Sequence, residues 1–151
     1  GLGELFVFLF FGLFSVMGSY YLFSLKVTLE SFILACQFGL LATTLICVNN
    51  LRDRETDKEV GKRTMATRLS IRSYQYFILG TIFVPYLLLF FFKEFRFIPV
   101  VLLALLPALK LSSIILKKKG ADLNEGLKFS GIHLIVFSLL ISLTFMYESL
   151  F

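Results

Sequence analysis

The sequence predicts an all-α integral membrane protein. Its 151 residues are 58% hydrophobic, with a mean hydropathy of +0.86, and they include 19 Phe. This apolar content exceeds what a soluble core of that size can bury. The apolar residues form long continuous runs, whereas the strands of a membrane barrel would show alternating segments of about 10 residues. Continuous runs rich in Leu, Phe and Ile therefore favour transmembrane helices.

Five runs are long enough to span the bilayer, since roughly 20 helical residues cross about 30 Å of hydrocarbon. They cover residues 5–25, 29–50, 74–92, 97–116 and 129–147. In the first run Gly12 and Gly18 belong to a series of small residues, which indicates close helix packing. His133 in the fifth run is expected to hydrogen-bond to a neighbouring helix rather than to act in catalysis. Residues 1–151 are thus expected to form one transmembrane domain.

The first apolar run begins within a few residues of Gly1, and no basic flank or cleavable signal segment precedes it. We therefore expect the chain to be part of something longer. Cys36 and Cys47 both lie in the second run, without a CxxC motif or a Cys/His group beside them. Neither a disulfide nor a zinc site is expected from them.

The positive charges gather in two of the four connections between the runs. Arg52, Arg54, Lys58, Lys62, Arg63, Arg68 and Arg72 follow the second run, and Lys110, Lys117, Lys118, Lys119 and Lys128 lie around the connection between the fourth and fifth runs. The other two connections hold only Lys26, and Lys93 with Arg96. The positive-inside rule then places the N-terminal end and both basic connections in the cytoplasm, and Phe151 on the opposite side. Lys117 to Lys119 are expected to anchor this topology at anionic lipid, and no nucleic-acid partner is expected.

The most informative stretch is the charged one that follows the second run, "VNNLRDRETDKEVGKRTMATRLSIR", residues 48–72. It holds seven Arg or Lys and four Asp or Glu in 25 residues. Each such charge at the bilayer centre would cost about 2.5 to 3.5 kcal/mol, so the stretch must lie at or above the membrane surface. Residues 51–73 are therefore expected to form a cytoplasmic loop that carries chemistry.

No Gly or Pro interrupts the chain between the second run and Gly61, so we expect the helix to continue beyond the lipid. On that extension Asn49, Asp53 and Asp57 recur at i, i+4 and i+8, and Asn50 lies three residues before Asp53. Two carboxylates one turn apart can share one Mg²⁺, which takes one or two protein carboxylates and completes its shell with water and phosphate. Asp53 and Asp57 are the predicted metal ligands and catalytic residues, and Asn49 and Asn50 are predicted to orient water or diphosphate.

The residues after this acidic face complete a predicted diphosphate site. Gly61 can end the helix in a left-handed conformation. Lys62 and Arg63 would then neutralise phosphate oxygens, and the Thr64 hydroxyl would donate one more hydrogen bond. Arg52 is a weaker candidate because it lies about 100° around the helix from Asp53. The same spacing is also compatible with a solvated helix face that makes only weak ion pairs.

Beyond spacing, the run "NNLRDRETDKEVGKRTMATRLS" resembles the second aspartate-rich motif of the UbiA-type intramembrane aromatic prenyltransferases. The sequence of this motif is similar to that of the branch that prenylates 1,4-dihydroxy-2-naphthoate in menaquinone biosynthesis. "GLGELFVFLFFGLFSVMGSYYL" resembles the segment that opens the second half of those enzymes. The two stretches cover about 43 residues, and further along the chain only helix number and length agree.

This resemblance implies a nine-helix bundle in the cell (plasma or inner) membrane, of which the present chain is similar to the last five helices. It implies transfer of a polyprenyl group from polyprenyl diphosphate to 1,4-dihydroxy-2-naphthoate, with Mg²⁺ as cofactor and with release of diphosphate and CO₂ to give demethylmenaquinol. The family's first aspartate-rich motif has no counterpart in these residues. The missing N-terminal half is therefore an expected partner, and the isolated chain is expected to be inactive.

Three alternatives remain open. The first is a prenyltransferase of the same family that uses another aromatic acceptor. The second is a small transporter or membrane subunit whose charged loop only fixes orientation, although such proteins usually carry ionisable groups deep inside their spans. The third is a CDP-alcohol phosphatidyltransferase, whose motif begins with Asp-Gly, a pair that is absent from this sequence.

Overall fold

In the computed structural model of the protein, residues 1–92 and 98–150 are described, and all of their regular structure is helical. The elements in chain order are α1 Gly3–Val7, η1 Phe8–Met17, α2 Gly18–Ser24, α3 Leu29–Arg52, α4 Arg54–Glu59, α5 Met65–Arg68, α6 Ile71–Leu88, η2 Leu89–Phe91, α7 Ile98–Val101, η3 Leu102–Ala104, α8 Leu105–Lys117, η4 Gly120–Leu123 and α9 Asn124–Leu150. The all-α fold class is confirmed.

Four helical segments of the described residues are long and apolar enough to cross a membrane: Gly3–Ser24, Leu29–Arg52, Ile71–Phe91 and Gly120–Tyr147. They correspond to the first, second, third and fifth predicted runs. The fourth predicted run, 97–116, is helical from Ile98 to Lys117, but a 3₁₀ turn divides it between α7 and α8. Residue 97 lies outside the described residues, as do Lys93, Arg96 and Phe151. A count of five spans therefore stays a prediction.

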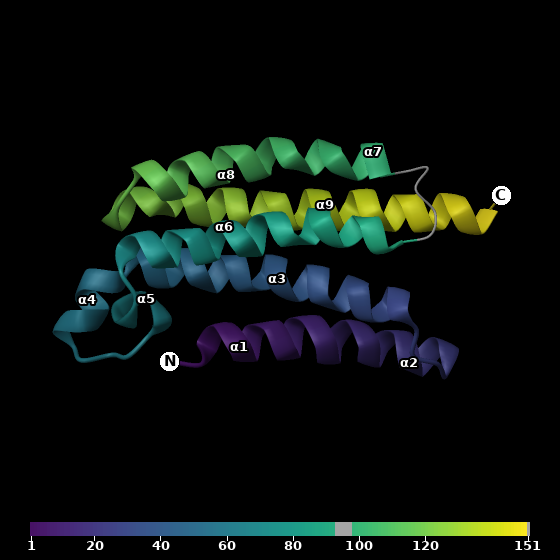
Figure 1. The fold of residues 1–151 in the computed structure, drawn as a ribbon, viewed down its shortest axis with the longest axis horizontal. Helices are drawn as coiled ribbons and strands as arrows, with labels where there is room; N and C mark the ends of the chain where they lie inside the picture. Colours follow the sequence, from purple (N-terminus) through teal and green to yellow (C-terminus); the bar gives the residue numbers. More distant parts are fainter. Residues whose placement is uncertain (93–97, 151) are drawn as a thin grey trace.

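The long helices lie side by side as an antiparallel bundle (Figure 1). Helix α3 packs against η1, α6 and α9, so it occupies the middle of the bundle, and α8 packs against α9 and α6. A capping box fixes the start of α3, where the Thr28 hydroxyl accepts from the Ser31 N–H and the Ser31 hydroxyl accepts from the Thr28 N–H. The aspartate segment continues from the opposite end of this central helix.

Hydrogen bonds between side chains and neighbouring helices add direction to the apolar packing. Thr44 of α3 donates to Thr81 of α6 at 2.9 Å. The Tyr86 hydroxyl of α6 lies 2.8 Å from Nε2 of His133 in α9. The interhelical hydrogen bond expected of His133 is confirmed.

Gly12 of the first helix packs against Gly39 of α3. A Cβ atom added to Gly12 would lie 2.5 Å from the Cα of Gly39, a distance at which one backbone must move. The close packing predicted from the small residues of this helix is therefore confirmed at Gly12. It is wrong at Gly18, where an added Cβ would meet nothing within 4 Å. Between Phe8 and Met17 this helix is π-helical, and many of its large apolar side chains are exposed.

Both strongly basic connections lie at one end of the bundle. Figure 1 shows α4 and α5 at the same end as the link between α8 and α9, while the link between α2 and α3 lies at the other end. The first residues of the chain also lie near α4 and α5 (Figure 1). This arrangement agrees with the relative placement that the charge distribution predicts.

Candidate diphosphate and metal site

The aspartate segment is a helix with one break rather than the continuous extension that the sequence predicts. Helix α3 ends at Arg52, and Asp53 has φ −90° and ψ 6° before α4 begins at Arg54. The turn is nevertheless kept, because the Asp57 N–H donates to the Asp53 carbonyl at 2.8 Å. The two aspartates therefore remain one turn apart.

Gly61 ends α4 as predicted, with φ +70°. The Gly61 N–H donates to the Lys58 carbonyl at 3.0 Å, and the Lys62 N–H donates to the Asp57 carbonyl at 2.8 Å. These are the two bonds of a Schellman motif, which requires a residue in the left-handed conformation. The turn sends Lys62 back toward α4.

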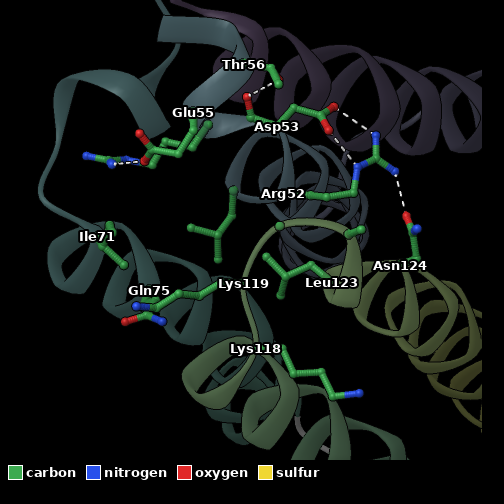
Figure 2. Close-up of a pocket in the computed structure, with 14 residues that line it drawn as sticks. Arg52, Asp53, Glu55, Thr56, Ile71, Gln75, Lys118, Lys119, Leu123 and Asn124 are labelled. Carbon is green, nitrogen blue, oxygen red and sulfur yellow. Dashed lines mark hydrogen bonds and ion pairs between the residues drawn. The ribbon is translucent and has the colours of Figure 1, made fainter.

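Asp53 is bound by the neighbouring residue Arg52 (Figure 2). Nε of Arg52 donates to Oδ1 of Asp53 at 2.7 Å, and Nη2 donates to Oδ2 at 2.8 Å. The same Nη2 donates to Oδ1 of Asn49 at 2.8 Å, and the Asn49 amide lies 3.4 Å from Oδ2 of Asp53. The expectation that Arg52 lies off this face was wrong, because its long side chain turns back onto the carboxylate at the helix break.

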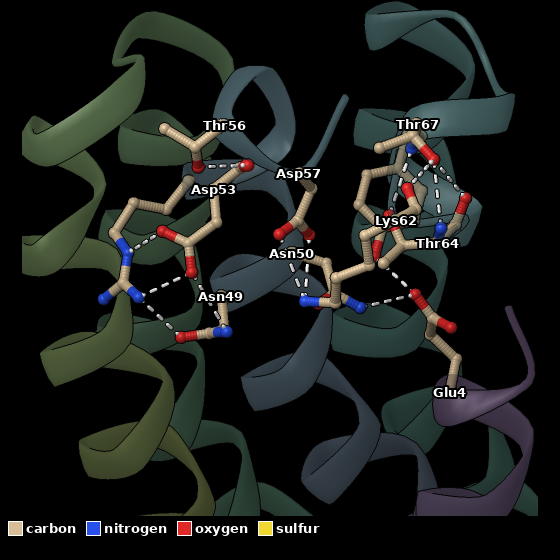
Figure 3. Close-up of polar contacts among 11 residues, drawn as sticks. Glu4, Asn49, Asn50, Asp53, Thr56, Asp57, Lys62, Thr64 and Thr67 are labelled. Carbon is tan, nitrogen blue, oxygen red and sulfur yellow. Dashed lines mark hydrogen bonds and ion pairs between the residues drawn. The ribbon is translucent and has the colours of Figure 1, made fainter. Parts of the chain in front are cut away.

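Asp57 has a different cation. Nζ of Lys62 lies 3.1 Å from the Asp57 carboxylate, whose side chain is only 10% exposed. Oδ2 of Asp57 is buried and accepts no hydrogen bond from the described residues. Figure 3 shows Asp53 directed toward Asn49 and Asp57 directed toward Lys62. The two carboxylates thus stand one turn apart and share no hydrogen-bond partner among the described residues, although the charge of Lys62 also lowers the pKa of Asp53.

The prediction that Asn50 joins this face was wrong. Its Nδ2 donates instead to Oε1 of Glu4 at 3.0 Å, and the Tyr74 hydroxyl donates to the same oxygen at 2.8 Å (Figure 3). Glu4 is 2% exposed, although it lies in α1 at the beginning of the chain. Its importance was missed, and the signal that marks it is an isolated acid at the start of an otherwise apolar span.

The three residues after Gly61 have unequal roles. Lys62 contacts Asp57, as described above, and Arg63 is exposed. The Thr64 hydroxyl accepts from the Thr67 N–H at 3.2 Å and so caps the short helix α5. Because Thr64 is buried and caps this helix, the structure gives it a local structural role beside the phosphate contact predicted for it.

A cavity of about 480 Å³ opens beside Asp53 (Figure 2). Its walls come from the end of α3, the start of α6 and the link between α8 and α9. Arg52, Asp53, Glu55, Gln75, Lys119 and Asn124 are among the residues that line it. Nη1 of Arg52 donates across this space to Oδ1 of Asn124 at 3.0 Å. Asp57 is not part of the lining, so the cavity reaches only one of the two carboxylates.

The electrostatics of the segment favour ionised carboxylates. The Arg52 guanidinium holds the pKa of the Asp53 carboxyl below its usual range, through hydrogen bonds and then through charge attraction. The Arg54 guanidinium likewise lowers the pKa of Glu55. Both groups are therefore anionic at neutral pH.

The donor set fits a hard divalent cation. Carboxylate and amide oxygens of Asp53, Asp57 and Asn49 are the kind of ligand that Mg²⁺ prefers. Lys62 contacts the Asp57 carboxylate at 3.1 Å, and a carboxylate has about four lone-pair sites, so Asp57 has capacity for another partner. Among the described residues no three His, Cys, Asp or Glu side chains converge. This part of the chain therefore offers two carboxylates and amide oxygens, a set that leaves metal positions for water and phosphate.

Comparisons with known proteins find several similar enzymes. The 1,4-dihydroxy-2-naphthoate octaprenyltransferase of Escherichia coli (strain K12) is 46% identical over 69 residues, which are 46% of this chain and 22% of that protein. The enzyme of the same name from Haemophilus influenzae is 45% identical over 69 residues, and the one from Mycobacterium tuberculosis is 42% identical. The matches thus span less than a quarter of the length of these relatives.

No solved structure matches the chain. The profile of the UbiA prenyltransferase family matches residues 1–139, a range that contains the first helix, the central helix and both aspartates. That match extends over most of the chain. The chain belongs to the UbiA prenyltransferase family.

Proposed function

We propose that the protein transfers a polyprenyl group from polyprenyl diphosphate to 1,4-dihydroxy-2-naphthoate, with release of diphosphate and CO₂. The observation that carries this proposal is the 42–46% identity to three octaprenyltransferases named for that acceptor, together with the family match over residues 1–139. The product would be demethylmenaquinol, the prenylated quinol from which menaquinone is made. The membrane bilayer would hold the prenyl chain.

In this proposal Asp53 and Asp57 hold Mg²⁺, which would neutralise the negative charge on the diphosphate. Asn49 orients water or diphosphate at the same end of α3, one turn before Asp53. Lys62, whose Nζ lies 3.1 Å from Asp57, and the exposed Arg63 contact the phosphate oxygens. Positive groups fixed in advance stabilise the charge that develops on a leaving diphosphate. Residues 51–73 thereby act as the cytoplasmic diphosphate-binding loop.

Apolar helices supply the second requirement of the reaction. An allylic carbocation reacts with water unless water is excluded, and the Phe-rich and Leu-rich helices provide dry walls. Aromatic faces also stabilise a cation. The acceptor ring then attacks the allylic carbon, and CO₂ leaves the ring.

The test uses the purified full-length protein in detergent or liposomes, with Mg²⁺, a polyprenyl diphosphate and 1,4-dihydroxy-2-naphthoate. Prenylated product is measured by mass spectrometry in Asp53→Asn, Asp57→Asn and the control Glu55→Gln. Glu55 is a matched control because it is an acid of the same short helix whose side chain is 70% exposed. We expect both Asp variants to lose turnover and the Glu55 variant to retain it.

Two results would contradict parts of this proposal. Normal turnover in both Asp variants would reject their metal role. Prenylation of another aromatic acceptor in preference to the naphthoate would reject the acceptor assignment and leave the prenyltransferase assignment intact. Omission of Mg²⁺, with a chelator present, distinguishes a metal-dependent reaction from background.

A further inference from the structure

Arg52, the last residue of α3, has more oxygen partners than a simple surface ion pair. The Arg52 guanidinium donates to both Asp53 oxygens, at 2.7 and 2.8 Å, and to Oδ1 of Asn49 at 2.8 Å. Its remaining terminal nitrogen donates to Oδ1 of Asn124 at 3.0 Å. Oxygens from three residues therefore converge on one organic cation.

The contact with Asn124 joins Arg52 to a distant part of the chain. It is the first residue of α9 and lies 72 positions after Arg52 in the chain. Figure 2 shows its side chain directed at the guanidinium from across the cavity, while Asp53 holds the other edge of the same group. Arg52 is thus held between two helices, with its charge over the carboxylate that faces the cavity.

This position conflicts with metal binding. Mg²⁺ needs ligand oxygens at about 2.0 to 2.1 Å, and the guanidinium already donates one hydrogen bond to each Asp53 oxygen. The arginine also carries a positive charge that cannot be removed by deprotonation. The charge of Arg52 at this carboxylate therefore opposes a divalent ion there, and movement of Arg52 away from Asp53 favours the ion.

We propose that Asn124 is a positioning residue that latches Arg52 over Asp53, so that Arg52 and the metal compete for this carboxylate. The inference rests on the proposed metal role of Asp53. When the metal binds, Arg52 leaves Asp53 and Asn124, and its five N–H donors become available to the diphosphate on the same side of the cavity. The latch thereby couples the start of α9 to the occupancy of the aspartate site.

The environment of the latch permits this movement. The Arg52 and Asp53 side chains are 26% and 32% exposed, so neither must cross a packed core to change partner. The other acid near the start of α9, Glu125, is bound by Lys118 and lies 3.7 Å from Lys110, so it has cations of its own. Asn124 is neutral, and its single hydrogen bond to Arg52 can break without leaving a buried charge.

The test measures Mn²⁺ binding to the purified full-length protein by electron paramagnetic resonance, with Asn124→Ala, Arg52→Gln and the double variant. We expect Asn124→Ala to tighten Mn²⁺ binding by about three- to tenfold, the range that the net contribution of one typical, partly exposed hydrogen bond supports. Arg52→Gln should tighten it at least as much. In the Arg52→Gln background the Asn124 substitution should have no further effect, because the latch is already absent.

Gln75→Ala is the matched control, since it removes another amide of the same cavity. Nε2 of Gln75 donates to the Ile115 carbonyl at 2.7 Å and not to Arg52, so Mn²⁺ affinity should not change. Asn124→Leu serves as a second latch variant of similar size, and thermal unfolding in detergent verifies that each variant is folded. In the prenyl-transfer assay Asn124→Ala should lower the Mg²⁺ concentration needed for half-maximal rate.

Several outcomes would overturn the latch. Weaker Mn²⁺ binding in Asn124→Ala, in both backgrounds, would make Asn124 a direct ligand instead. Unchanged binding in Asn124→Ala and Asn124→Leu, with Mn²⁺ binding lost in Asp53→Asn, would remove the latch and keep the proposed function. If the wild-type protein binds no Mn²⁺ at the aspartates, both the latch and the proposed metal role fail.

Discussion

The two asparagines at the end of α3 enter two very different polar clusters. Asn49 belongs to the cluster with Arg52 and Asp53, which is charged and about one third exposed. Asn50 belongs to the cluster with Glu4 and Tyr74, which is buried and whose hydrogen bonds in the described part of the chain include no Lys or Arg. Partly exposed ion pairs are readily exchanged for other partners, whereas a buried carboxylate depends on its few hydrogen bonds. One helix end therefore presents both a cluster whose ion pairs can change partner and a buried cluster that joins α1 to α3.

The largest expected effect is a difference in prenyl-transfer rate between variants of the two clusters. Asp53→Asn should reduce prenyl transfer by about 100-fold or more, because fixed electrostatic groups at a reacting centre contribute on that order. Glu4→Gln, which keeps an acceptor oxygen for Asn50 and Tyr74, should retain most of the activity. The measurement is the initial rate with saturating substrates. Equal losses in the two variants would break the distinction.

The next effect concerns stability, and here we expect the larger loss in the Glu4 variant and the smaller one in the Asp53 variant. Glu4→Ala leaves the buried Asn50 amide and the Tyr74 hydroxyl without their acceptor, at about 1 to 3 kcal/mol for each group. Asp53→Ala should change the free energy of unfolding by less than about 1 kcal/mol, because its ion pair is partly exposed. Unfolding in detergent with increasing denaturant provides the comparison. A larger loss in Asp53→Ala than in Glu4→Ala would contradict it.

A smaller effect is expected for Tyr74→Phe, which removes one donor to Glu4 and leaves the ring in place. The expected loss is about 1 kcal/mol, the net contribution of a typical hydrogen bond. The melting temperature in detergent gives the measurement. Tyr76→Phe is the control, because Tyr76 lies on the same helix and is 67% exposed. Similar losses at both positions would show that the Glu4 cluster does not act as a fixed unit.

The smallest effect is a pH dependence in the exchangeable cluster. Arg52 holds the Asp53 pKa below its ordinary value of 3.8, so the ion pair stabilises the folded protein fully above that pH. The stabilisation is lost as the pH falls below 3.8 and through the lower pKa of the folded state. The stability difference between wild type and Asp53→Asn should therefore shrink on acidification. A difference that does not change with pH would contradict the ion pair.

The sequence predicts the helical class and the place of the aspartates because both follow from short-range patterns. Apolar runs show the spans, and the spacing of Asp53 and Asp57 puts them one turn apart. The helix break at Asp53 was not predictable from Gly and Pro alone, since neither occurs there. Arg52 was misjudged because helical angle describes where a side chain begins, and a long arginine ends elsewhere.

The partner of Asn50 was missed for a different reason. Glu4 is 46 residues away and meets Asn50 only because α1 packs beside α3. Spacing within one helix contains no information about such a contact. Asn124 is likewise 72 residues from Arg52, so its hydrogen bond depends on how α9 starts. Pairs that join separate helices require the packed bundle.

The contact between Gly12 and Gly39 has a consequence for residues at another level of the bundle. Because the two backbones touch there, they determine how far α1 can slide along α3, and hence the height at which Glu4 meets Asn50. A side chain as small as alanine at Gly12 would force the helices apart deep among apolar neighbours. The defect would then be observed two turns away, as a misaligned acid at the water-facing end, in a region that the altered residue never touches.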